Sequence, residues 1–118
     1  MDTRTKIVSL EQARRLADDW RQGGEAVRAV IGYFDPLLPE FVSRLRAAAE
    51  GGRLVAVVAA PQDAYLEARA RAELAAALDF VDAVVMGEDA GGLGDLLSLD
   101  EPGLRREFIE YVRRQSQC

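Results

Sequence analysis

The chain has 118 residues, of which 49% are hydrophobic and 30% charged, with a net charge of −5 and a pI of about 4.8. This length accommodates one hydrophobic core, so we expect a single domain over residues 1–118. The acidic balance argues against a nucleic-acid-binding surface. The sequence has no His and a single Cys, Cys118, which argues against an internal disulfide and the usual zinc sites.

Hydropathy along the chain predicts where the protein resides. No stretch is apolar over the length needed to span a membrane, and the amino terminus lacks the apolar segment of a secretory signal. We therefore expect a cytoplasmic protein that has no membrane partner.

The first predicted elements are a helix and a strand. Ser9 and Gln12 have the spacing of a capping box. Apolar residues then recur at helical spacing, at Ala13, Leu16, Ala17 and Trp20. Gly23-Gly24 predicts the end of this helix, and the β-branched run 27–31 predicts the first strand.

Helix and strand patterns then alternate up to residue 86. Pro39 suits the first turn of a helix, whose apolar positions repeat at helical spacing until Gly51-Gly52. Residues 54–60 are continuously apolar, which is typical of a strand buried on both faces of a parallel sheet. The Ala-rich stretch 64–78 predicts a helix, and residues 81–86 predict a third strand.

The segment after the third strand is rich in glycine and acidic residues. Residues 87–94 predict a flexible loop, and Asp100 is placed to cap a last helix with an apolar stripe. Glu88, Asp89 and Asp95 lie in or beside this loop. Their spacing is not that of an EF-hand, so we favour a solvated acidic loop over a weak divalent-cation site and expect no metal.

The order of elements predicts an α/β fold of the Rossmann-like, three-layer type, with a parallel sheet between helices. The three strands are expected in the order third, second, first, which leaves the edge of strand 27–31 unpaired. Native proteins cover or pair an apolar edge. The last helix could cover it within the chain, or a second subunit could pair with it. We expect a homodimer, or a complex with another protein.

Residues 32–41, Gly-Tyr-Phe-Asp-Pro-Leu-Leu-Pro-Glu-Phe, join the first strand to the second helix. Open α/β sheets bind phosphates at such a turn, because free N–H groups and the helix dipole point at the ligand. The segment resembles the Gly-x-Phe-Asp-x-x-His-x-Gly-His signature of the cytidylyltransferase-like nucleotidyltransferases, in the branch of ADP-heptose synthase and glycerol-3-phosphate cytidylyltransferase. Residues 6–10 resemble the lead-in to the nucleotidyltransferase domain, and residues 70–78 and 81–85 resemble later segments of the family, so the resemblance covers roughly residues 6–86.

The resemblance implies a nucleotide site and a shortened nucleotidyltransferase fold. Carried over position by position, the candidate nucleotide-binding residues are Gly32, Tyr33, Phe34, Asp35 and Arg71. An active member of the family would use CTP or ATP with magnesium.

The signature is incomplete in this chain. Leu38 and Phe41 occupy the two histidine positions, and Glu40 occupies the glycine position between them. Nucleotidyl transfer depends on positioning and on electrostatic stabilisation of the phosphates, so losing both histidines removes its main stabilising groups. We therefore expect no catalytic residue and no cofactor, in a non-catalytic domain that serves as a binding or assembly module. The alternative is a residual nucleotide-binding domain or an active cytidylyltransferase-like enzyme of sugar-phosphate metabolism.

Each candidate residue also has a purely structural interpretation. Gly32 can form a tight turn, Asp35 can cap the next helix, and Tyr33 and Phe34 can pack in the core. Arg71 is expected to be an exposed helical arginine that is solvated or paired. Two other doubly wound classes are disfavoured: a dinucleotide-binding domain needs two further glycines after the first strand, and a phosphorelay receiver needs a Lys after its fifth strand.

Overall fold

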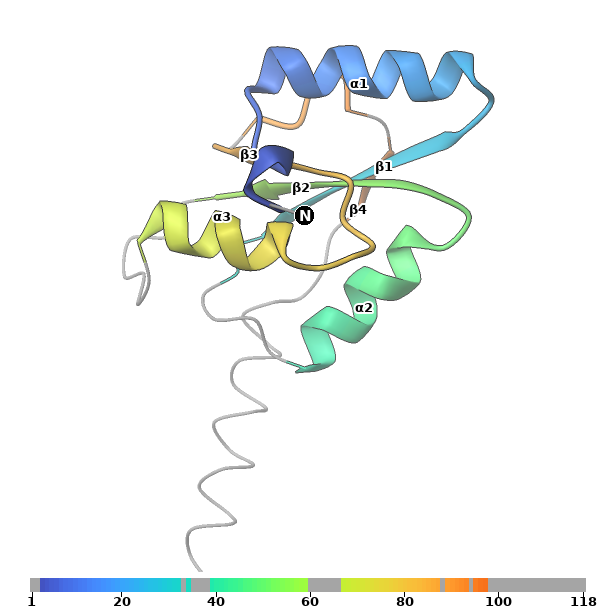
Figure 1. Ribbon diagram of the computed structural model, residues 1–118. Coiled ribbons are helices and arrows are strands. Elements are labelled where there is room, and N and C mark those ends of the chain that lie inside the picture. The colour runs from blue at the N-terminus through green and yellow to red at the C-terminus, as the bar shows by residue number, and fades with distance from the viewer. Residues whose placement is uncertain are drawn as a thin grey trace, which may run out of the picture.

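The computed structural model describes residues 3–32, 34, 39–59, 67–87 and 89–93, together with the backbone of 95–97. These residues form one parallel sheet with helices on both faces, as Figure 1 shows. The architecture confirms the expected Rossmann-like α/β fold. The elements in chain order are η1 (Thr3–Lys6), α1 (Leu10–Gln22), β1 (Ala26–Gly32), α2 (Pro39–Ala49), β2 (Gly52–Val58), α3 (Ala68–Ala76), β3 (Ala83–Met86) and β4 (Asp95–Leu97).

The sheet has four parallel strands in the order β3-β2-β1-β4. The predicted order of the first three strands is confirmed. The prediction that β1 has an unpaired edge is wrong, because Arg28–Val30 pair with Asp95–Leu97 of β4. A strand of three residues beside glycines is too short to produce a periodic pattern in the sequence. The expected helix after Asp100 lies outside the described residues.

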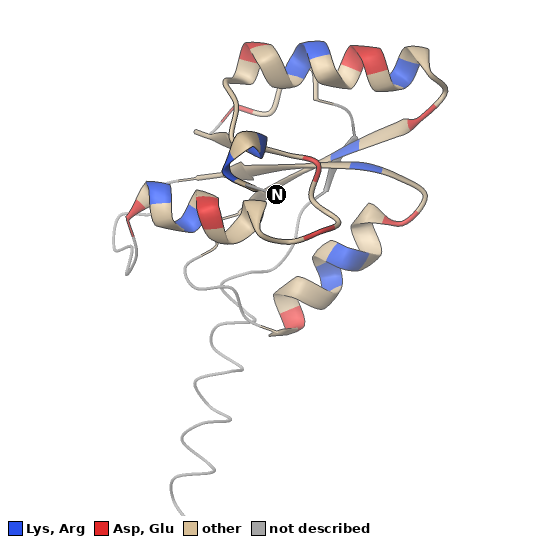
Figure 2. Cartoon of the chain, in the orientation of Figure 1, with Lys and Arg blue, Asp and Glu red and all other residues tan. Residues whose placement is uncertain are grey.

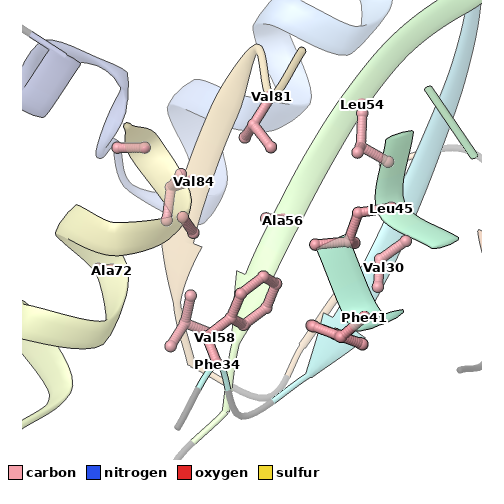
Figure 3. Close-up of a cluster of buried hydrophobic side chains, with 12 residues drawn as sticks. Val30, Phe34, Phe41, Leu45, Leu54, Ala56, Val58, Ala72, Val81 and Val84 are labelled. Atoms are coloured by element: carbon pink, nitrogen blue, oxygen red, sulfur yellow. The ribbon is translucent and has the colours of Figure 1, made fainter. Parts of the chain in front are cut away.

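Helices α2 and α3 cover one face of the sheet (Figure 1). Phe41 and Leu45 of α2 pack on the side chains of β1 and β2 that point to this face. Figure 3 shows this cluster, whose fully buried members include Val30, Leu54 and Val84. The strands are apolar on both faces because both faces carry helices, as the continuous apolar run predicted.

Helix α1 covers the other face. Its contact residues Ala13 and Ala17 are fully buried, and these small side chains let the helix lie close to the sheet. The predicted capping box is present: the Gln12 N–H donates to Ser9 Oγ over 3.1 Å, and the Ser9 N–H donates to Gln12 Oε1 over 3.0 Å. The helix ends at Gly23, as predicted.

The connection from β3 to β4 passes over the same face as α1. Leu93 in this connection is fully buried and belongs to the α1-side cluster. The described residues of the connection, 87 and 89–93, form turns rather than a helix. Helix α1, which precedes β1 in the chain, therefore provides the helical layer that a crossover helix normally supplies.

Charged residues of both signs alternate along α1, whereas α2 begins with an acidic residue that basic ones follow (Figure 2). Several pair within one helix turn, including Glu11 with Arg15 and Glu40 with Arg44. Arg69 and Glu73, four residues apart on α3, pair in the same way at 3.4 Å. No helix in the described part of the chain is long and apolar enough to span a membrane.

Candidate functional site

From β1 the chain adds β2 and then β3 on one side of the sheet, and it then returns to add β4 on the other side of β1. The order of the strands therefore reverses at β1. In open α/β sheets, ligands bind outside the carboxyl ends of the strands at such a reversal. Gly32 is the last residue of β1 and is buried. Its carbonyl accepts a hydrogen bond from the Ala59 N–H over 2.9 Å, which ties the ends of β1 and β2 together.

Phe34 follows at this edge with a backbone φ of 55°, the one positive value recorded for a non-glycine residue in the described part of the chain. The left-handed conformation is costly for a bulky side chain and persists where the surroundings enforce it. Here the ring is fully buried and contacts Phe41 edge-on, with 5.3 Å between ring centroids. The expected packing role of Phe34 is confirmed.

Phe41 stands at the second histidine position of the signature. Its side chain is 1% exposed and lies in the core between α2 and the sheet, near Phe34 (Figure 3). The neighbouring Glu40 is exposed and lies 3.5 Å from Arg44. A carboxylate in the first turn of a helix complements the helix dipole, so it competes with a phosphate for the same positive end.

The expectation that Arg71 is exposed is wrong. Its side chain is 2% exposed, and it is the one buried charged residue among the described residues. The Arg71 Nη1 donates to the carbonyl of Ala59, whose N–H in turn bonds Gly32. The first turn of α3 places the arginine beside the end of β2, where burial requires a bonded guanidinium.

The structure therefore brings three of the five predicted nucleotide-binding residues, Gly32, Phe34 and Arg71, to the carboxyl edge of the sheet. Tyr33 and Asp35 lie outside the described residues. Leu38, at the first histidine position, also lies outside them.

A cavity of about 400 Å³ opens at the opposite, amino-terminal edge of the strands. Sequence reasoning missed it, because its lining comes from separated turns: Gly24, Glu25, Ala49, Gly51, Gly52, Arg53, Phe80 and Asp82. The Arg53 guanidinium bridges Glu25 at 3.0 Å and Asp82 at 3.1 Å. Hydrogen bonds to Glu25 first, and then to Asp82, raise the pKa of Arg53. Its charge is thus matched by this chain's own carboxylates.

The described residues contain no cluster of three or more His, Cys, Asp or Glu side chains that could hold a metal ion. Asp89 instead organises a turn, since its Oδ1 accepts from the Gly91 N–H over 2.8 Å. Its Oδ2 lies 3.5 Å from Arg14 Nη2. The side chains of Glu88 and Asp95 lie outside the described residues.

The parallel sheet between two layers of helices defines a Rossmann-like α/β domain. No family model matches the chain. The chain is 36% identical, over 119 aligned positions and 92% of its length, to "Bifunctional protein HldE" of Gluconobacter oxydans (strain 621H). It spans about a quarter of that protein, 25% of its length. The similarity supports the resemblance to the cytidylyltransferase-like nucleotidyltransferases.

Proposed function

We propose that this chain is a nucleotidyltransferase-like domain that does not catalyse nucleotidyl transfer and acts as a binding or assembly module. One observation carries the proposal. The position that bears the second catalytic histidine in the signature holds Phe41, and its ring is buried in the hydrophobic core against Phe34. A side chain in that place packs the scaffold and presents no donor to a triphosphate.

Electrostatics supports the same proposal. Transfer to or from a nucleoside triphosphate needs cationic or hydrogen-bonding groups around the phosphates. The sequence contains no His, and Glu40 adds a negative charge at the start of α2. The buried guanidinium of Arg71 already bonds the Ala59 carbonyl.

The module would work through contacts with a second copy of the chain or with another protein. The premise of an open β1 edge no longer supports a dimer, because β4 pairs there. The assembly role is still supported by the combination of two features: the signature histidines are absent, and the hydrophobic core of the domain is complete.

The test combines a transfer assay with calorimetry. Pyrophosphate release from CTP and ATP, with magnesium and a sugar phosphate, should stay at the level of buffer. Titration of the chain with CTP or ATP, with and without magnesium, should give no saturable heat and no thermal shift. Turnover that exceeds buffer in proportion to the chain's concentration would refute the proposal.

A second candidate is residual nucleotide binding, as in a domain of sugar-phosphate metabolism that uses CTP or ATP with magnesium. The strand reversal at β1 favours it, because Gly32, Phe34 and Arg71 lie at the edge where such sheets bind ligands. Saturable binding below millimolar concentration, lost in Asp35→Ala and kept in Asp18→Ala on the remote helix α1, would support this candidate.

A further inference from the structure

The edge strand β4 is held in place from two directions. Within the sheet, Asp95–Leu97 pair in parallel with Arg28–Val30 of β1. From outside the sheet, helix α1 holds residues 89–93, which lead into β4. The strand itself is three residues long, so its position depends strongly on the segment that delivers it.

Two arginines of α1 make this outer contact. The Arg14 Nε donates to the Gly91 carbonyl over 2.6 Å, and the Arg21 Nη2 donates to the Gly92 carbonyl over 3.2 Å. They are seven residues apart, about two turns, and so lie on one side of the helix. The Arg14 and Arg21 side chains are 45% and 38% exposed. Water can therefore compete for these bonds, and such exposed contacts open at low cost.

The connection that they hold has the composition of a hinge. Gly87, Gly91, Gly92 and Gly94 make up half of residues 87–94. Gly87 and Gly92 have φ angles of 150° and 81°, which side chains rarely adopt. The apolar anchor of the connection is Leu93, which is fully buried against the α1 side of the sheet.

Opening this connection would leave β1 with an apolar free edge. Ala29 and Val30, which pair with β4, are fully buried in the closed chain. A free apolar edge pairs with another strand when one is available. The strand that matches this edge in register is β4 itself, and a second copy supplies an identical one.

We propose that Arg14 and Arg21, by bonding residues 91–92, act as a latch that keeps β4 in its own chain. Release of this latch lets two copies of the chain exchange β4 and form a dimer. The exchanged dimer recovers every sheet contact of the closed monomer, and it is opposed by the entropy of association and by the loss of the two arginine bonds. This inference deepens the assembly role proposed above and rests on it for its biological use.

A disulfide staple distinguishes the closed from the exchanged form. Ala29 and Leu96, which are partners in the sheet, are both replaced by cysteine in Ala29→Cys/Leu96→Cys. Cys118→Ser removes the one cysteine of the parent chain. Backbone partners of neighbouring strands lie within disulfide range. In the monomer the disulfide forms within one chain, and in the exchanged dimer it links two chains. A non-reducing gel separates the linked dimer from the monomer.

The double substitution Arg14→Ala/Arg21→Ala removes the latch in the protein that carries the staple. The matched control is Arg15→Ala, because Arg15 lies on the same helix and pairs locally, with Glu11. After incubation at high concentration and oxidation, we expect the latch variant to show about tenfold more interchain-linked dimer than the control. Light scattering on the unstapled proteins should show the same rise in dimer.

The inference is overturned if the latch variant remains folded and monomeric by circular dichroism and light scattering, or if it dimerises with the staple closed within each chain. If the double variant unfolds, the single variant Arg21→Ala is tested by the same criteria. The proposed non-catalytic function stands or falls separately, since pyrophosphate release does not depend on the outcome of the gel.

Discussion

At the scale of single residues, Phe41 and Arg71 show what motif positions can and cannot predict. The motif located both residues, but it could not tell which way each side chain points. Phe41 faces the core because the first turn of α2 lies over β1 and β2. Arg71 is buried because α3 begins beside the end of β2, so that a backbone carbonyl receives its guanidinium. Such details depend on how two elements pack, which sequence spacing does not encode.

Restoring the signature histidine at position 41 should damage the fold without restoring activity. Phe41→His places a polar ring in a buried site among apolar side chains, so we expect a loss of about 3 kcal/mol in the free energy of unfolding. The control Ser43→His, on an exposed position of α2, should change it by less than about 0.5 kcal/mol. Urea denaturation measures both, and equal stability of the two variants would contradict the burial of Phe41.

At the scale of elements, the sequence predicted those with strong local signals. Helix α1 has both a capping box and four apolar residues at helical spacing, and its bounds agree with the prediction. Strand β4 was missed because three residues cannot show a period and because its partner, β1, is distant in the sequence. The sequence also did not predict that α1 packs against the β3–β4 connection, because these two segments are distant in the sequence.

The cap of α1 is expected to contribute measurably. Ser9→Ala removes the oxygen that accepts the Gln12 N–H, which should lower the free energy of unfolding by about 1 kcal/mol. Ser43→Ala makes the same chemical change at an exposed helical position, where alanine should be neutral or slightly stabilising. Chemical denaturation of both variants, compared with the parent chain, tests this difference. An equal effect of the two substitutions would mean that the cap contributes nothing.

Alanine substitutions at two glycines with similar φ angles test how closely α1 packs against residues 91–92. Gly92 has φ 81°, and a Cβ there would lie 3.3 Å from Arg14 Nε. Gly24 has φ 85°, and a Cβ there would meet no atom within 4 Å. Both alanine variants incur the left-handed penalty of about 1 kcal/mol. We expect Gly92→Ala to lower the melting temperature further than Gly24→Ala does, because Arg14 must also move.

At the scale of the whole molecule, the titratable groups predict a flat response to pH. The chain has no His, so no side chain with an ordinary pKa near neutrality is present. Hydrogen bonds to Glu25 and then to Asp82 raise the pKa of Arg53 above its ordinary value, so its stabilising contribution is complete across the neutral range and is lost only at strongly alkaline pH. We expect the free energy of unfolding to vary by less than about 1 kcal/mol from about pH 6 to pH 9. A steep change within this range would show that another group titrates.

The short segment before α1 has a consequence for how the chain folds as it is synthesised. Ile7 bridges Val84 of β3, the Val8 N–H donates to the Val84 carbonyl over 2.9 Å, and Lys6 Nζ donates to the Leu78 carbonyl over 3.0 Å. Residues 6–8 therefore find these partners only after residue 84 has been synthesised. Until then the apolar stripe of α1 lies beside an incomplete sheet, so this domain reaches its final packing only after β3 has been synthesised.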